Sequence, residues 1–172
     1  MRRYSIVFLV QGGLIAALYV ALTWLSTIFQ LSSFAIQVRL SEALAILPAF
    51  TPAAIPGLTV GCIISNLMVP GVHPLDILGG SFATLLGAVC CYLISRLLSS
   101  HEKAKCWMSP LPNFAFNTVI VPFVLKFAYQ LPEGYFFLMF TVGAGEFVAG
   151  CLLGWVLYRS IYPIKSRIFI TK

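Results

Sequence analysis

The sequence predicts an all-α integral membrane protein, a bundle of six helices with both termini on the cytoplasmic side. Of the 172 residues, 60% are hydrophobic and only 9% are charged, and the charged residues come in clusters separated by long apolar stretches. A soluble domain carries about 25% charged residues, whereas a helix of about 20 apolar residues crosses a bilayer. We therefore expect residues 1–172 to form a single transmembrane domain.

Six apolar segments follow one another along the chain. The first, 6–31, follows Arg2 and Arg3. It is too long for the apolar part of a signal peptide, and no small-residue cleavage site ends it, so we expect it to be retained. The others are 40–55, 57–69, 75–98, 113–131 and 135–158. The second and third are short, since about 13 helical residues reach only about 20 Å. A broken or re-entrant hairpin is the alternative to two full crossings there.

The positive charges support an even number of crossings. With a cytoplasmic N-terminus, most of the lysines and arginines fall on or near the cytoplasmic side, and only Arg39 and Lys126 lie towards the outside. This distribution follows the positive-inside rule. The cytoplasmic residues are Arg2, Arg3, Arg96, Lys103, Lys105, Arg159, Lys165, Arg167 and Lys172. Together with anionic inner-leaflet lipid, the asymmetry explains the net charge of +6, so we expect no nucleic-acid partner.

Motifs of several function classes are missing from the sequence. The five cysteines form no CxxC pair and show no metal-ligand spacing with histidine, so we expect them to be small apolar helix residues. No metal or cofactor site is predicted. There is no GxxxxGKS/T phosphate loop, no HExxH zinc helix and no GxSxG nucleophile turn. Six short helices without an internal repeat are also a poor basis for a self-sufficient secondary transporter.

The acidic residues are distributed differently from the basic ones. Four of the five belong to the outer half of the protein or face it from within a span: Glu42, Asp76, Glu133 and Glu146. Asp76 and Glu133 could be solvated carboxylates in the first turn of a helix. Glu146 lies about a dozen residues into the last span, where a carboxylate costs about 2.5–3.5 kcal/mol. We expect it to face a binding cavity, the alternative being a structural ion pair with a residue such as Lys126.

Further polar residues interrupt the apolar segments. Arg39 and Glu42 are three residues apart, so on a helix they share a face. They either pair with each other or line the outer mouth of a pocket. Asn117 and Asn66 are amides within apolar spans, able to hydrogen-bond a ligand or a neighbouring helix.

The first span carries small residues at four-residue spacing: Gly12, Gly13, Ala16, Ala17 and Ala21. Such a smooth face lets another helix approach closely. It can serve internal packing, or it can be a docking face for another membrane subunit.

These features together resemble a known family. A small six-span protein with a small-xxx-small first helix and no ATPase of its own resembles the substrate-binding (S) component of an energy-coupling factor (ECF) transporter. The blocks 38–44 (VRLSEAL, followed by Leu47-Pro48), 61–67 (GCIISNL) and 76–85 (DILGGSFATL) are similar to the queuosine-precursor transporter (QueT) family. The similarity runs nearly end to end, and the first block is its most specific part.

The resemblance implies a function in the plasma membrane of a bacterium. The chain would bind its ligand from outside and dock on a transmembrane coupling subunit through the first-helix face. Two cytoplasmic ATPase subunits would then power release by toppling the S component in the membrane. The ligands assigned to the family are queuosine precursors, that is, 7-deazaguanines such as queuine or 7-aminomethyl-7-deazaguanine.

The predicted substrate site follows from this ligand. Glu146 would accept the paired N–H donors of the Watson–Crick edge, and Asn117 would serve the O6 edge. The cationic aminomethyl arm would pair with Glu42 or, as second choice, with Asp76. Arg39 and Lys126 complete the predicted site. The candidates for an aromatic contact with the ring are Trp24, Phe34, Phe114, Phe116, Tyr129 and Tyr135.

Two other functions remain open from the sequence, and an enzyme is less well supported. The chain could be an S component for another vitamin or nucleobase, or a small membrane scaffold with no small-molecule ligand. An integral membrane enzyme would need a nucleophile–base pair or a metal set that the sequence does not display.

Overall fold

The computed structural model describes residues 2–29, 31 and 38–169, and within these the chain is all-α. Four helical stretches are long and apolar enough to cross a membrane: Ser5–Ile28, Pro74–Leu97, Glu102–Phe127 and Tyr135–Ile168. Two further apolar helices, Leu40–Ala49 and Ala54–Leu67, are shorter. The chain is therefore a multi-pass membrane protein of six helical segments. Four of the described segments have the length of a full crossing.

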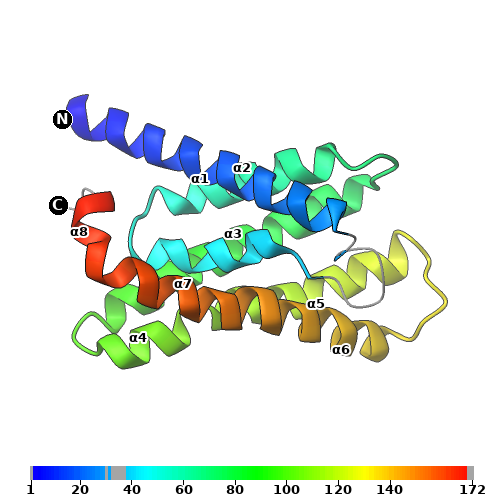
Figure 1. Ribbon diagram of the computed structural model, residues 1–172. Helices are drawn as coiled ribbons and strands as arrows, with labels where there is room; N and C mark the ends of the chain where they lie inside the picture. The colour runs from blue at the N-terminus through cyan, green and yellow to red at the C-terminus, as the bar shows by residue number, and fades with distance from the viewer. Residues whose placement is uncertain (1, 30, 32–37, 170–172) are drawn as a thin grey trace.

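The elements have the following bounds: α1 Arg2–Ile28, η1 Leu40–Ala49, α2 Ala54–Leu67, α3 Pro74–Leu97, α4 Glu102–Met108, α5 Leu111–Phe127, α6 Tyr135–Glu146, η2 Phe147–Leu152, α7 Leu153–Ile161, η3 Tyr162–Ile164 and α8 Lys165–Ile168. η1 is a 3₁₀-helix and η2 is a π-helical segment. Because η2 joins α6 to α7 without a break, the three form one continuous rod (Figure 1).

The helices lie roughly along one common direction, with α1 and α2 on one side and the α6–α7 rod on the other (Figure 1). Both ends of the described chain lie at the same end of the bundle, together with α4 and α8. A hydrogen bond from Gln11 Nε2 to the carbonyl of Ile168, 3.4 Å long, ties α1 to α8 there. We call this the terminal end of the bundle.

η1 occupies the centre of the bundle, packed against α1, α3, α7 and η2. Residues Ser41 to Ala49 are all buried. At about 2 Å per residue, a ten-residue 3₁₀-helix extends only about 20 Å. The chain then turns through Thr51 and Pro52 before α2 begins at Ala54. Irregular backbone at membrane depth is tolerated where protein covers it, and η1 meets that condition.

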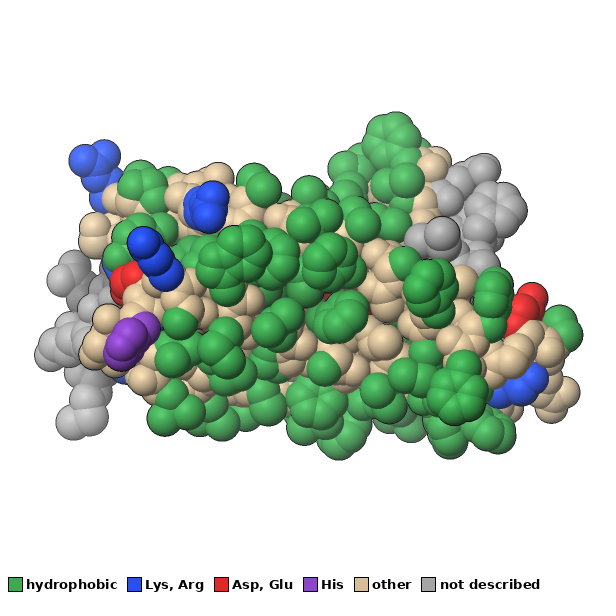
Figure 2. Space-filling view, turned by 90° about the horizontal axis from the view of Figure 1, so that it is seen from below, with side chains coloured by type: hydrophobic (Ala, Val, Ile, Leu, Met, Phe, Trp, Pro, Cys, Tyr) green, Lys and Arg blue, Asp and Glu red, His purple; other side chains and the backbone are tan. Residues whose placement is uncertain are grey.

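The side of the bundle is apolar and its ends are charged. In the face shown in Figure 2, hydrophobic side chains cover the middle of the molecule, and the Lys, Arg, Asp, Glu and His side chains gather towards the two ends. Large side chains such as Leu9, Leu97, Phe136 and Phe140 are 70–83% exposed. This is the surface of a protein whose sides face lipid, as the composition predicts.

Two glycines of α2 bring its backbone close to α1. A Cβ at Gly57 would lie 2.7 Å from the carbonyl oxygen of Gly12, and a Cβ at Gly61 would lie 3.0 Å from that of Ala16. Gly12 and Ala16 are buried in this contact, whereas Gly13, Ala17 and Ala21 are exposed. The small-residue face of the first span is therefore divided. One row packs against α2, and the other faces away from the bundle.

Replacing Gly57 with leucine should force α1 and α2 apart, because the added Cβ would meet backbone that cannot rotate away. We expect a loss of about 1–3 kcal/mol in stability and a lower unfolding temperature. A thiol-reactive dye measures this directly, since Cys62, Cys91, Cys106 and Cys151 are buried until the protein unfolds. Gly13→Leu is the matched control, because no atom lies within 4 Å of a Cβ built there. Equal unfolding temperatures for the two variants would contradict the close contact.

Candidate functional site

A buried carboxylate, that of Glu42 in η1, joins three elements at the centre of the bundle. Only 3% of Glu42 is exposed. Its Oε1 accepts a hydrogen bond from Tyr19 Oη at 2.6 Å. Its Oε2 accepts two more, from Asn113 Nδ2 at 2.9 Å and from Asn117 Nδ2 at 3.2 Å. With three donors around it, neither oxygen of this buried carboxylate lacks a partner.

The two asparagines reach Glu42 because α5 is regular there and close to α3. They are four residues apart, so they lie on one face of α5. On α3, Gly87 leaves the space that Asn113 fills: a Cβ at Gly87 would lie 2.7 Å from the Cα of Asn113. A larger residue at position 87 would therefore displace the α5 face that carries both amides.

Hydroxyl groups of α1 hold the start of η1 in place. Ser26 Oγ accepts a hydrogen bond from the backbone N–H of Leu40 at 2.8 Å. One turn away, Thr23 Oγ1 donates to Ser41 Oγ, also at 2.8 Å. The residue before η1, Arg39, makes no side-chain cap. The hydroxyls of α1 therefore supply hydrogen-bond partners to the first turn of η1. They fix the position of Glu42 relative to α1.

Glu146 differs from Glu42 in having an oxygen without a partner. It is the last residue of α6, only 7% exposed, and is followed directly by the π-helical segment η2. Among the described residues, its Oε2 accepts no hydrogen bond. π-Helical segments occur often at functional sites. A buried, unsatisfied carboxylate oxygen is costly, so it points to a donor supplied from elsewhere.

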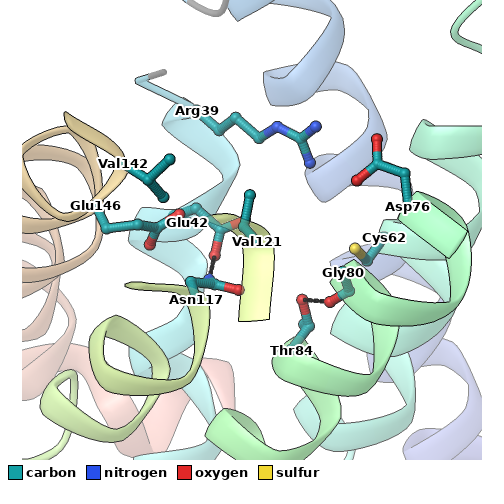
Figure 3. A pocket seen from close by; sticks show the side chains of 10 residues that line it. All are labelled: Arg39, Glu42, Cys62, Asp76, Gly80, Thr84, Asn117, Val121, Val142 and Glu146. Carbon is teal, nitrogen blue, oxygen red and sulfur yellow. Dashed lines mark hydrogen bonds between the residues drawn. The ribbon is translucent and has the colours of Figure 1, made fainter. Parts of the chain in front are cut away.

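Arg39 and Asp76 face each other across the mouth of the space between η1 and α3 (Figure 3). Arg39 Nη1 donates to Asn66 Oδ1 of α2 at 3.2 Å. Asp76 Oδ2 accepts from Tyr129 Oη at 3.2 Å. Partial burial raises the pKa of the Tyr129 phenol, and the neighbouring Asp76 carboxylate adds to the rise. In the described part of the chain, neither Arg39 nor Asp76 has an ion-pair partner within 4 Å.

A cavity lies between these side chains. Its walls are Arg39, Glu42, Cys62, Asp76, Gly80, Thr84, Asn117, Val121, Val142 and Glu146. The free volume is about 20 Å³, which is room for about one water molecule. Figure 3 shows Glu42 and Glu146 on one side, Asp76 and Thr84 on the other, and Arg39 above them. The arrangement offers both acceptors and a cationic donor to a group that enters.

Five of the six residues predicted to bind substrate line this cavity, and the sixth lies elsewhere. Lys126 Nζ donates to the carbonyl oxygens of Leu131 at 2.9 Å and Glu133 at 3.0 Å. It therefore fastens the loop between α5 and α6, and it does not form the ion pair with Glu146 that was the alternative to a binding role. Arg39 likewise bonds Asn66 rather than Glu42, so the alternative of an Arg39–Glu42 pair is absent from the described contacts.

Sequence reasoning missed Tyr19 and Asn113, the other two donors to Glu42. Asn113 could have been found from its spacing, because it precedes Asn117 by one helical turn in the same apolar span. Tyr19 gave no such signal, since an aromatic residue in a membrane helix is ordinary. Its role depends on η1 lying against α1, which the sequence does not specify.

None of the five described aromatic candidates lines the cavity. Tyr129 bonds Asp76 at the mouth, Tyr135 Oη donates to the carbonyl of Val119, and Phe114 packs against Phe147. Trp24 is 54% exposed on α1. Phe34 lies outside the described residues. Within those residues, no three His, Cys, Asp or Glu side chains group as metal ligands.

Comparison with known families identifies the chain. The model of a family described as "QueT transporter" matches residues 9–163. No curated protein and no solved structure matches the chain. The matched region covers most or all of each of the four apolar stretches of crossing length. It also contains every residue of the cavity wall. The chain therefore belongs to the QueT transporter family, a family of membrane transporters and not of enzymes.

Proposed function

We propose that the chain is the substrate-binding S component of an ATP-driven ECF importer, and that the cavity around Glu146 binds a 7-deazaguanine precursor of queuosine. The observation that carries the proposal is the buried Oε2 of Glu146, which has no hydrogen-bond partner in the described chain and lies at the cavity wall. A ligand with paired N–H donors would satisfy it. Membership of the QueT family supports transport as the purpose of that binding.

The contacts support somewhat different proposed roles for the cavity residues than the sequence alone suggests. The Asn117 amide group donates to Glu42, and its carbonyl oxygen points into the cavity (Figure 3). Asn117 would therefore accept from a base N–H, and the Arg39 guanidinium would donate to the O6 edge. The Watson–Crick donors N1–H and N2–H of a deazaguanine suit the Glu146 carboxylate in bidentate geometry.

The cationic arm of 7-aminomethyl-7-deazaguanine fits Asp76 better than Glu42. Glu42 already accepts three hydrogen bonds of the about four that its lone pairs allow. Asp76 accepts one, from Tyr129, and it lies at the mouth of the cavity. We therefore assign Glu42 to positioning the asparagines and Asp76 to the ammonium group.

Loading such a ligand requires the cavity walls to move apart. The free volume of about 20 Å³ holds one water-sized group, and a two-ring heterocycle is much larger. We infer that the described structure is a closed state and that the ligand binds to a wider one. Binding then stabilises the protein by an amount that grows with ligand concentration.

Glu146→Gln should weaken binding of 7-aminomethyl-7-deazaguanine at least tenfold, about 1.4 kcal/mol. The amide keeps the shape of the side chain but replaces one acceptor oxygen with a donor that faces the donors of the base. Isothermal titration with the purified protein measures the dissociation constant. Glu133→Gln, in an exposed loop, is the control and should bind normally.

An unchanged dissociation constant in Glu146→Gln would rule out its role. If the wild-type protein gained no thermal stability from any deazaguanine, guanine or vitamin, the scaffold alternative would replace the proposal. Stabilisation by a different nucleobase or vitamin alone would keep the S-component role and change the ligand.

We further propose that the terminal end of the bundle is cytoplasmic. Arg96, Lys105 and Lys165 gather there, and cationic residues accumulate on the cytoplasmic side of membrane proteins. The mouth of the Glu146 cavity, with Asp76 and the loop that holds Tyr129, would then face outwards.

Cysteines placed in two loops test this orientation. In intact cells, a membrane-impermeant maleimide should label Gly134→Cys, between α5 and α6, and should not label Ser100→Cys, between α3 and α4. Both positions are exposed, so both should react after the cells are opened. The reverse pattern would place the terminal end outside.

The coupling subunit would dock on the outward row of α1. Gly13, Ala17 and Ala21 line one wall of a shallow apolar groove of about 870 Å³, and Val60 and Ile64 of α2 line the other. Helices in lipid associate most closely through small residues of this kind. Two cytoplasmic ATPase subunits would complete the importer.

Ala17→Trp should abolish uptake of the deazaguanine by cells that express the complete importer, because the indole fills the groove. Binding by the solitary protein should be unchanged, since Ala17 faces away from the bundle. Val156→Trp is the control: it adds the same side chain at an exposed position on α7 and should transport normally. Normal uptake by Ala17→Trp, or loss of binding without loss of uptake, would place docking elsewhere.

A further inference from the structure

A second cavity lies at the terminal end of the bundle, away from the Glu146 site. It has a volume of about 360 Å³. Four elements form its walls: the end of η1 with the turn after it, the last turns of α3, and the short helices α4 and α8. The lining residues are Pro48, Ala49, Phe50, Pro52, Tyr92, Ser95, Arg96, Ser99, Lys105, Lys165, Ser166 and Phe169.

Three cations line this cavity, and one acid stands near it. Arg96, Lys105 and Lys165 contribute three positive charges. Glu102 lies 3.8 Å from Lys165 and also accepts a hydrogen bond from Tyr158. The other four acidic residues are accounted for at the Glu146 cavity or in the loop before α6. The cavity therefore keeps a surplus of positive charge that the described side chains do not balance.

The donors of two of these cations, Arg96 and Lys105, are largely uncommitted, whereas Lys165 pairs with Glu102 and lies over the Tyr162 ring. Arg96 Nε donates to Tyr92 Oη at 3.1 Å, which leaves its two terminal nitrogens for another acceptor. Among the described residues, Lys105 Nζ makes no hydrogen bond or ion pair. The Ser99 and Ser166 hydroxyls line the same space. A guanidinium fork, ammonium groups and hydroxyls together match the oxygens of a phosphate group.

The remaining wall of the cavity is apolar. Phe50 and Phe169 stack with ring centroids 5.8 Å apart, and Pro48 and Pro52 lie beside them. The volume exceeds that of a bare phosphate ion. A phosphodiester with an attached glycerol would use both kinds of wall. Basic pockets between helices at the cytoplasmic interface are known places for anionic lipid headgroups.

We propose that this cavity is a phosphate-binding site whose occupant is the headgroup of an anionic phospholipid. The site is separate from the substrate cavity, and its occupation does not depend on the ligand or on the partners proposed above. A lipid headgroup and a free phosphate ion offer the same phosphate oxygens to the cations. The apolar wall and the position at the end of an apolar bundle favour the lipid.

Native mass spectrometry of the purified full-length protein tests the proposal. Phosphatidylglycerol, phosphatidylcholine and inorganic phosphate are titrated separately, and thermal stability is followed in parallel. We expect phosphatidylglycerol to bind at least about tenfold more tightly than phosphatidylcholine. The double variant Arg96→Gln/Lys105→Gln should lose that preference. Arg167→Gln removes one charge from the same end at an exposed position outside the cavity and should retain it.

Lys105→Gln alone guards against misfolding, because its ammonium has no hydrogen-bond partner among the described residues to lose. It should keep the unfolding temperature of the lipid-free protein and weaken phosphatidylglycerol binding.

If inorganic phosphate stabilised the wild-type protein as strongly as the lipid, and the double variant abolished this, the phosphate site would hold with free phosphate as its source. Equal lipid binding by the double variant and Arg167→Gln would overturn the site. The site would also be overturned if the double variant bound phosphatidylglycerol normally and impaired only uptake by cells. That result would mean that these cations contact a protein partner.

Discussion

The hydrogen bonds to the buried carboxylate of Glu42 hold the centre of this protein together. Their donors come from Tyr19 of α1 and from Asn113 and Asn117 of α5. A carboxylate buried in a membrane protein is costly unless donors surround it. The bonds therefore fix η1 between α1 and α5. Since η1 also forms one wall of each of the two cavities, both sites depend on how this 3₁₀-helix is held.

The two buried glutamates differ in how many hydrogen bonds their carboxylates accept. Glu42 accepts three hydrogen bonds, whereas Glu146 keeps one oxygen without a partner in the described chain. A carboxylate whose two oxygens are both hydrogen-bonded holds its donors in place, whereas one with an unpaired oxygen costs free energy until a donor arrives. A ligand that supplies N–H donors would regain that free energy on binding, and this is the physical basis of the proposed site.

Small residues place these polar groups at bonding distance. Gly57 and Gly61 let α2 lie against α1, and Gly87 lets α3 lie against the asparagine face of α5. In lipid there is no hydrophobic force between helices, so close packing of this kind supplies much of their association. The small residues of α1 that are not packed against another helix, Gly13 and Ala17, are exposed along a groove between α1 and α2. Their exposure leaves room for the coupling subunit that we propose docks there.

The sequence by itself determined the class of the protein, because composition, the long apolar segments and the clustering of charge all reflect the bilayer as solvent. It also pointed to five wall residues of the cavity, since Arg39, Glu42, Asp76, Asn117 and Glu146 are polar groups where apolar ones are cheaper. Only the tertiary structure decided which acid is free and which is bonded, and that Lys126 serves a loop. It also decided that residues 40–49 form a buried 3₁₀-helix. These outcomes depend on which helices are neighbours and how closely they approach, and a single sequence records spacing along the chain but not distances across it.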